Sequence, residues 1–373
     1  MPPILRLLDR LLRPWLRRLP QPVKLGLHVG LGRLRSAVPR RFRPQPNYQQ
    51  RVAAEVERFA GEEVVHDLPP IFHYWSNTWL RPQLEAFGFS SPDDFMALYA
   101  GRAIEAAVAA GRPARLVSLG CGNCDAEIAL ARTLRARGHE NFCIECVDIN
   151  PAMLARGAQL AAEAGMEGHI VPVQGDFNHW QPNGRYCAII ANQSLHHVVE
   201  LEHLFGQIEA ALDTGGLFIA SDMIGRNGHM RWPEAMAIVQ EFWRELPSSY
   251  RWNRQLHRQE NRLLNWDCSV VGFEGIRSQD ILPLLVARFD FEFFFGFGNL
   301  IDPFIDRGFG PHFDADASWD RDFIDRVQQR DEAEMRAGTI KPTHMLAVMR
   351  SRPWGGSCQY RGNLSPAFCV RPV

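Results

Sequence analysis

The chain has 373 residues, of which 46% are apolar and 22% are charged, and it contains eight cysteines. A chain of this length and composition can bury a large core without disulfides or structural metals, which excludes disordered, collagen-like and disulfide-scaffold proteins. The formal net charge of −1 argues against a protein that coats nucleic acid along its whole surface.

The charge is distributed unevenly along the chain. Residues 1–45 carry a net charge of +10, which leaves −11 on the remaining 328 residues. In this segment apolar residues recur at helical spacing and arginines fall on the opposite arc, although Pro14 would kink or end such a helix. A basic amphipathic helix favours contact with an anionic membrane surface. Docking on the protein's own body and removal as an organelle-targeting presequence are open alternatives.

No stretch of the sequence has the roughly 18 apolar residues of a membrane-spanning helix, and no secretory signal is visible. We therefore predict a cytoplasmic protein with reduced cysteines, with peripheral membrane binding through residues 1–45 as an option. The remainder of the chain is net acidic, so nucleic acid is not expected as a partner. The sequence indicates no oligomeric state.

Between residues 113 and 226, short apolar strands alternate with longer helical stretches. Five strands are predicted, over Arg115–Leu119, Phe142–Asp148, His169–Val173, Tyr186–Ala191 and Leu217–Asp222. Three helices are predicted between them, over Asp125–Arg137, Pro151–Ala164 and Leu201–Leu212. This alternation predicts an α/β fold with a doubly wound, mostly parallel sheet.

The flanks of this core are less regular. Two apolar strands, Phe291–Phe297 and His344–Arg350, are expected to complete the sheet as an antiparallel pair. Residues 351–373 are rich in proline and glycine and show no periodic pattern, which predicts a flexible segment. We divide the chain into six segments: the basic segment 1–45, a helical cap 46–112, the core 113–226, a helical insertion or lid 227–290, C-terminal strands with an Asp-rich helical insertion 291–350, and a flexible tail 351–373.

Glycines and acids follow the predicted strands at their carboxyl ends, where doubly wound sheets bind ligands. Gly120, Cys121 and Gly122 follow the first strand. Such a turn lets a ligand approach the backbone, and the amides that open the next helix favour an anionic group. Asp148 ends the second strand and can accept hydrogen bonds from both hydroxyls of a ribose.

The other strand ends carry groups suited to a purine. Asp176 follows the third strand and can accept a hydrogen bond from an exocyclic amine. Ile149 and Phe177 offer apolar faces to a purine ring. Asn192 ends the fourth strand, and Asp222 ends the fifth.

Five segments resemble, in order, the motifs of class I S-adenosylmethionine-dependent methyltransferases: 119–122, 147–154, 175–177, 190–197 and 212–217. The resemblance covers about residues 113–224. It implies a Rossmann-like sheet of seven strands, S-adenosyl-L-methionine as the cofactor, and methyl transfer as the reaction.

The resemblance also implies roles for single residues. By position, Gly120 and Gly122 flank the methionine part of the cofactor, Asp148 binds the ribose, Asp176 and Phe177 bind the adenine, and Asn192 lies beside the transferable methyl group. Ser118 stands where many relatives have an acid, and Cys124 stands where a third glycine is common. The methionine end of the cofactor can therefore be held differently in this chain.

Two other classes of protein stay open. A glycine turn with an acid after the second strand also occurs in dinucleotide-dependent oxidoreductases. That pattern requires a third glycine, which is absent at Cys124, and it assigns no role to the segment 195–197. The second alternative is a membrane-associated protein that binds the cofactor and has lost turnover.

A sulfonium methyl is already activated, so transfer mainly requires that the acceptor atom be held in line with it. We expect a small-molecule acceptor, with sugar-bearing or lipid-linked compounds as options and O-methylation favoured. A hydroxyl acceptor also needs a base. The catalytic candidates are His196, His73, His229 and Asp222, and the aromatic segments 72–79 and 228–243 are expected to form a lid.

We predict no metal ligands. Cys121, Cys124, Cys143 and Cys146 have the spacing of a four-cysteine zinc site. The last two, however, are three residues apart on a predicted strand and therefore point to opposite faces. The acidic run 314–325 imitates a calcium loop but lacks the glycine and the glutamate that such a loop requires.

Overall fold

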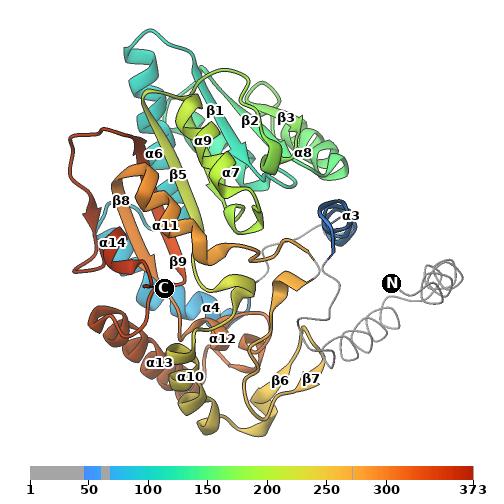
Figure 1. The fold of residues 1–373 in the computed structure, drawn as a ribbon, viewed down its shortest axis with the longest axis vertical. Coiled ribbons are helices and arrows are strands. Elements are labelled where there is room, and N and C mark those ends of the chain that lie inside the picture. The colour runs from blue at the N-terminus through green and yellow to red at the C-terminus, as the bar shows by residue number, and fades with distance from the viewer. Residues whose placement is uncertain (1–45, 60–67, 271, 373) are drawn as a thin grey trace, which may run out of the picture. The chain divides into compact units, whose positions relative to one another are not determined.

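The computed structural model describes residues 46–59, 68–270 and 272–372 (Figure 1). The chain divides into two compact units, residues 1–51 and residues 52–373. The basic segment 1–45 lies outside the described residues, so its membrane binding stays a prediction. The finer division into six segments also stays a prediction.

The second unit is built around an eight-stranded sheet with the order β10-β8-β9-β5-β4-β1-β2-β3. Its strands are β1 (Ala114–Leu119), β2 (Phe142–Asp148), β3 (Ile170–Gln174), β4 (Tyr186–Asn192), β5 (Leu212–Met223), β8 (Phe289–Phe297), β9 (His344–Ser351) and β10 (Gln359–Tyr360). Strands β1 to β5 pair in parallel, whereas β9 runs antiparallel to both β5 and β8. The predicted doubly wound, mostly parallel sheet is confirmed, and the two-residue β10 adds an eighth strand.

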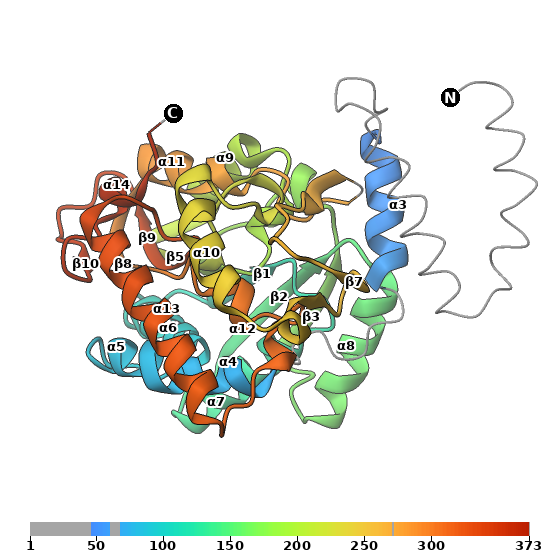
Figure 2. The same ribbon diagram turned by 90° about the horizontal axis from the view of Figure 1, so that it is seen from below.

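Helices cover both faces of the sheet (Figure 2). One layer contains α6 (Pro92–Ala109), α7 (Asp125–Ala136) and α8 (Pro151–Glu163), and the other contains α9 (Leu201–Ala211) and α11 (Ser278–Arg288). This double cover explains the continuous apolar sequence of the central strands, because a strand buried on both sides has no solvent face. In β4, six of the seven residues are buried.

Local sequence signals set where these helices begin. The side chain of Asn150 accepts the Ala152 amide at 3.0 Å and thereby caps α8, while Pro151 fits its first turn. The hydroxyl of Ser91 accepts the Asp94 amide at 3.1 Å and caps α6. The cap on α8 directly follows β2, so the polypeptide turns sharply at the carboxyl end of that strand.

The flanking segments are mostly helical, and the insertion 227–290 also contains a hairpin of β6 (Trp252–Asn253) and β7 (Arg258–Gln259). The remaining α-helices are α3 (Tyr48–Phe59), α4 (Pro70–Trp75), α5 (Arg81–Glu85), α10 (Pro233–Glu245), α12 (Asp302–Ile305), α13 (Ser318–Ala337) and α14 (Pro366–Cys369). Short 3-10 or π turns are η2 (Ser76–Leu80), η3 (Phe177–His179), η4 (Leu195–His197), η5 (Asn227–His229), η6 (Ser248–Arg251), η7 (Cys268–Val270) and η8 (Gly310–His312). Among the described residues, no helix is both long and apolar enough to cross a membrane.

The end of the chain differs from the expected flexible tail. Strand β10 pairs with β8, and Leu364 and Cys369 are buried. Arg361 donates hydrogen bonds to Glu332 at 2.6 Å and to the Gly296 carbonyl at 3.1 Å. A few tertiary contacts of this kind hold a segment that has no periodic pattern, which is why its composition alone predicted flexibility.

Candidate active site

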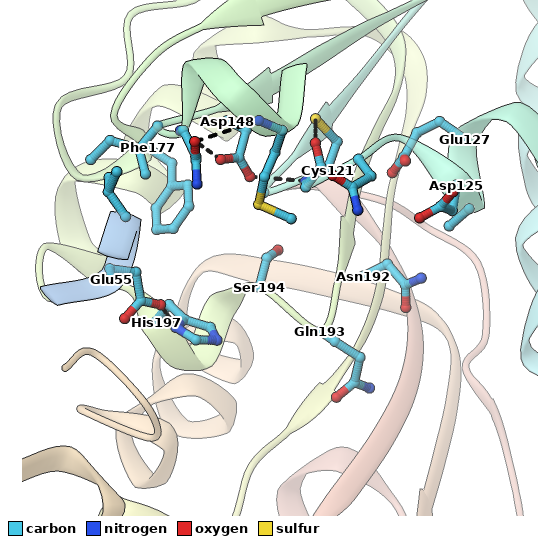
Figure 3. A pocket seen from close by; sticks show the side chains of 18 residues that line it. Glu55, Cys121, Asp125, Glu127, Asp148, Phe177, Asn192, Gln193, Ser194 and His197 are labelled. Atoms are coloured by element: carbon cyan, nitrogen blue, oxygen red, sulfur yellow. Dashed lines mark hydrogen bonds and ion pairs between the residues drawn. The ribbon is translucent and has the colours of Figure 1, made fainter. Parts of the chain in front are cut away.

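A cavity of about 200 Å³ opens at the carboxyl ends of β1, β2 and β4 (Figure 3). Strand β1 pairs with β2 on one side and with β4 on the other, so the cavity lies where the order of the strands reverses. Open α/β sheets bind their ligands at this point. The lining residues are Glu55, Val56, Gly120, Cys121, Gly122, Asn123, Asp125, Ala126, Glu127, Asp148, Ile149, Asn150, Met153, Phe177, Asn192, Gln193, Ser194 and His197.

The structure brings nearly all of the predicted cofactor-binding residues to this cavity. Those that line it are Gly120, Cys121, Gly122, Asp148, Ile149, Phe177 and Asn192. Asp176 is not among the lining residues. Its carboxylate accepts the Asn178 amide at 2.9 Å and lies 3.0 Å from His179 Nδ1. Asp176 therefore caps the turn η3, which places the next side chain, Phe177, in the cavity.

The turn after β1 is closely packed at Gly120. Its φ is +78°, a region that side-chain-bearing residues rarely adopt, and an added Cβ would lie 2.6 Å from Ser194 Cβ. Its amide donates to the Val147 carbonyl at 2.8 Å. The loops after β1, β2 and β4 thus meet around a position where only glycine fits.

Asp148 joins two of these loops. Its Oδ2 accepts the Gly122 amide at 2.9 Å and its Oδ1 accepts the Asn150 amide at 2.8 Å. Burial raises the pKa of Asp148, and the two amide donors partly offset this effect. Each carboxylate oxygen has a second lone pair, so both can still accept a hydrogen bond from a neighbouring pair of hydroxyls.

A second buried carboxylate, Glu127, lies on the other side of the cavity from Asp148 and Phe177 (Figure 3). Glu127 is in the first turn of α7 and only 4% exposed. Its Oε1 accepts the Ser118 hydroxyl at 2.6 Å, while its Oε2 has no hydrogen-bond partner among the described residues. Burial raises the pKa of Glu127 to about 7. A buried carboxylate oxygen without a donor is suited to a cationic ligand group.

Three of the four predicted catalytic residues gather next to the cavity, and Glu274 joins them. His196 Nδ1 lies 2.7 Å from Asp222 Oδ1, and His196 Nε2 lies 3.5 Å from Glu274 Oε1. His229 Nε2 lies 2.8 Å from the same Glu274 oxygen. His73, the fourth candidate, is exposed on α4. The cluster adjoins the cavity through the segment 192–197, which contributes lining residues on both sides of His196.

Opposite charges hold this cluster together. Burial opposes a proton on His196, but the Asp222 and Glu274 carboxylates outweigh burial and raise its pKa to about 10. Burial lowers the pKa of His229, and the contact with Glu274 partly offsets this. The two imidazoles hold the pKa of Glu274 well below its ordinary value despite burial.

The cysteines do not form a four-ligand group. The sulfur atoms of Cys121, Cys124 and Cys146 lie within 4.8 Å of one another, and Cys143 is not part of this group. Alternation along β2 sends Cys143 and Cys146 to opposite faces, as the sequence analysis predicted.

Residues 116–216 match the family model of a methyltransferase domain. This segment contains the glycine turn, Asp148, Phe177 and Asn192. Residues 116–216 therefore form a methyltransferase domain. The reaction of this methyltransferase is methyl transfer. No curated protein matches the methyltransferase.

Solved structures similar to this methyltransferase include the following three, which are all methyltransferases. The geranyl diphosphate C-methyltransferase from Streptomyces coelicolor A3(2) is 14% identical, and the match covers 82% of this chain and 100% of that chain with a TM-score of 0.41. The O-methyltransferase from a trans-AT PKS multienzyme of Brevibacillus brevis is 13% identical, with 78% and 86% covered and a TM-score of 0.40. For the StiE O-MT the identity is 14%, the covered shares are 81% and 91%, and the TM-score is 0.42.

Sequence reasoning missed two functional candidates of this methyltransferase. Glu127 lies in the first turn of the helix that follows the glycine motif, and this position is itself a signal for a group near the cavity. Glu274 lies in a loop without periodicity, 78 residues after His196. No local pattern connects the two residues, so the tertiary structure alone reveals their contact.

Proposed function

We propose that the methyltransferase holds the adenosine part of S-adenosylmethionine at Asp148 and Phe177 and the methionine part beside Glu127. The support is the separation of the two carboxylates across the cavity, with the Phe177 ring on the Asp148 side (Figure 3). The oxygens of Asp148 are suited to two ribose hydroxyls, and Glu127 Oε2 is suited to the ammonium group of methionine. Glu127 would then serve where relatives use an acid at the position of Ser118.

Replacing Glu127 with glutamine is expected to weaken binding of S-adenosylhomocysteine about 10- to 100-fold, because a charge-assisted hydrogen bond contributes about 1.5–3 kcal/mol. The same change should stabilise the ligand-free protein at pH 8. The pKa of Glu127 is raised from 4.5 to about 7 on folding. The contribution of Glu127 to wild-type stability is therefore fully present below pH 4.5 and is lost as the pH rises from 4.5 through 7, by up to about 3 kcal/mol, and glutamine avoids this loss.

Calorimetry at pH 8 and thermal unfolding at pH 8 and pH 4.5 would measure both effects. The matched control is Glu167→Gln, because Glu167 is an exposed glutamate outside the cavity lining. We expect the control to leave the affinity unchanged. Equal affinity for Glu127→Gln and wild type would contradict the proposed contact with the ammonium group.

We further propose that the acceptor is a small molecule and that a hydroxyl oxygen receives the methyl group. The observation that carries this proposal is the cluster of His196, His229, Glu274 and Asp222 beside the lining segment 192–197. A hydroxyl must lose a proton during transfer, whereas a neutral amine can attack with its lone pair. Imidazoles and carboxylates beside the cavity can accept such a proton, so they favour a hydroxyl acceptor. Sugar-bearing and lipid-linked hydroxyl compounds are the classes to test first.

The proposal can be tested with methyl-labelled cofactor and pairs of acceptors that share one skeleton and carry either a hydroxyl or an amine. Sugars and long-chain alcohols, each with the matching amine, form a suitable panel. We expect label on the hydroxyl member with repeated turnover, which would also exclude a protein that binds the cofactor silently. Transfer to amines alone would overturn the proposal. Competition between S-adenosylhomocysteine and NAD provides the test against a dinucleotide-dependent oxidoreductase.

A further inference from the structure

We propose that His196, His229 and Glu274 bind a divalent metal ion beside the cofactor cavity. One potential ligand atom from each residue lies within 4.8 Å of the other two. Glu274 Oε1 is 2.8 Å from His229 Nε2 and 3.5 Å from His196 Nε2. Ligands around an ion with bonds of about 2.0–2.2 Å lie at comparable distances from one another. Two histidines and one carboxylate are a typical ligand set for catalytic zinc and for other divalent transition metals.

The contacts of His196 resemble those of a histidine that binds a metal ion. A ligating histidine usually gives its second ring nitrogen to a carboxylate, which fixes the orientation of the ring. Here that carboxylate is Asp222, 2.7 Å from His196 Nδ1 and fully buried. Asp222 is itself fixed by the backbone amides of Ser194 at 2.8 Å and Leu195 at 2.7 Å. This arrangement leaves His196 Nε2 directed toward Glu274.

Backbone hydrogen bonds tie together the three segments that carry the proposed ligands. The Ile276 amide donates to the His196 carbonyl at 3.0 Å, and the Gly228 amide donates to the Gly275 carbonyl at 2.7 Å. An added Cβ on Gly275 would lie 3.0 Å from the Gly228 nitrogen, and one on Gly228 would lie 2.1 Å from Asp267 Oδ1. The segments around residues 228 and 275 therefore pack too closely for side chains at the two glycines. Three loops far apart in sequence are locked at the point where their polar side chains converge.

His229 shows backbone strain at the same place. Its φ is +53°, which is uncommon for a residue with a side chain. Strained residues persist only where their surroundings impose the conformation, and they are concentrated at functional sites. The strain at His229 brings its imidazole to Glu274, and we take this as independent support for a functional role of the triad.

The site is open to ligands on one side. The side chains of His229 and Glu274 are 20% and 19% exposed, whereas that of His196 is 5% exposed. An ion held by three protein ligands keeps at least one position for water or substrate. This inference rests on the proposed function in one respect, namely that the open position would receive the acceptor hydroxyl.

A bound cation makes a hydroxyl more acidic. In the transfer, the acceptor O–H gives its proton to solvent and the oxygen forms a bond to the methyl carbon. The carbon–sulfur bond breaks, and sulfur keeps the electron pair. These three residues were not predicted as metal ligands from the sequence, in which no local pattern connects Glu274 with the two histidines.

Zinc binding by the full chain, stripped of metal with a chelator, tests the proposal. We expect calorimetry to show one Zn²⁺ per chain for the wild type, and His229→Asn and Glu274→Gln each to weaken binding at least about tenfold. Asparagine tolerates the left-handed backbone of residue 229. The matched control is His257→Asn, since His257 is exposed and has a similar φ of +48°. The control should bind Zn²⁺ as the wild type does.

S-adenosylhomocysteine binding by the same preparations shows whether each variant is folded, and it separates this proposal from the proposed cofactor site. The visible spectrum of bound Co²⁺ provides a second readout, which should change in Glu274→Gln. Absence of Zn²⁺ binding by a wild-type protein that binds S-adenosylhomocysteine would overturn the metal site. Equal Zn²⁺ affinity of His229→Asn, Glu274→Gln and the wild type would overturn it as well.

Discussion

Asp148→Asn is expected to weaken binding of S-adenosylhomocysteine about 100-fold. Each oxygen of Asp148 holds one backbone amide and, in our proposal, accepts one ribose hydroxyl. Asparagine replaces one acceptor by a donor and removes the charge, so at least one charge-assisted hydrogen bond of about 1.5–3 kcal/mol is lost together with part of the loop geometry. Calorimetry at neutral pH, with thermal unfolding of the free protein, would measure the effect.

Asp306→Asn is the matched control for this substitution. Asp306 is exposed and also accepts a backbone amide, that of Arg307 at 2.7 Å, but it lies outside the cavity lining. We expect its affinity for S-adenosylhomocysteine to equal that of the wild type. If folded Asp148→Asn protein bound as tightly as the control, the assignment of Asp148 to the ribose would be wrong.

Gly120→Ala is expected to abolish measurable cofactor binding and to lower the free energy of unfolding. The added methyl group would lie 2.6 Å from Ser194 Cβ, so the loops after β1 and β4 must separate. Backbone strain at φ +78° costs about 1 kcal/mol, and the overlap adds about 1–3 kcal/mol. Urea unfolding and calorimetry would measure the two effects.

Gly111→Ala separates strain from overlap. Gly111 has a similar φ of +65°, and no atom lies within 4 Å of an added Cβ. We expect it to lose only the strain energy and to bind the cofactor normally. The double substitution Gly120→Ala with Ser194→Gly removes the overlap and should recover part of the stability. Equal losses for Gly120→Ala and Gly111→Ala would show that the contact with Ser194 has no energetic importance.

The strands that border the cavity were predictable because each has a continuous apolar sequence that ends in, or is followed by, a glycine, an acid or an amide. Strand β5 shows the limit of this reasoning. It was expected to begin at Leu217, since Asp213 to Gly216 reads as a turn, but it begins at Leu212. The pairing of Tyr186 with Leu212, across an irregularity in the register, extends the strand through those glycines. The observed start of β5 thus depends on pairing with a neighbouring strand, which the local sequence does not encode.

The residues of the candidate site also differ in how far the sequence predicts their positions. Asp148 and Asn192 are the last residues of their strands, and Phe177 lies three residues after β3, so chain order alone places them at one edge of the sheet. His196 follows β4 and Asp222 lies near the end of the neighbouring β5, and the two side chains do meet. Glu274 reaches the cluster only because its loop is bonded to the segment around Gly228. A contact that depends on two irregular loops is not predictable from a single sequence.

The position of β9 has a consequence for synthesis of the chain on the ribosome. This strand, residues 344–351, lies between β5 and β8, although it is made after both. The edge of β5 therefore stays without its final partner while about 120 further residues are translated, roughly 10 s at common rates. An unpaired apolar strand edge invites association with other chains. The yield of folded enzyme should thus depend on how quickly a C-terminal strand inserts into the middle of a sheet whose parallel half is already complete.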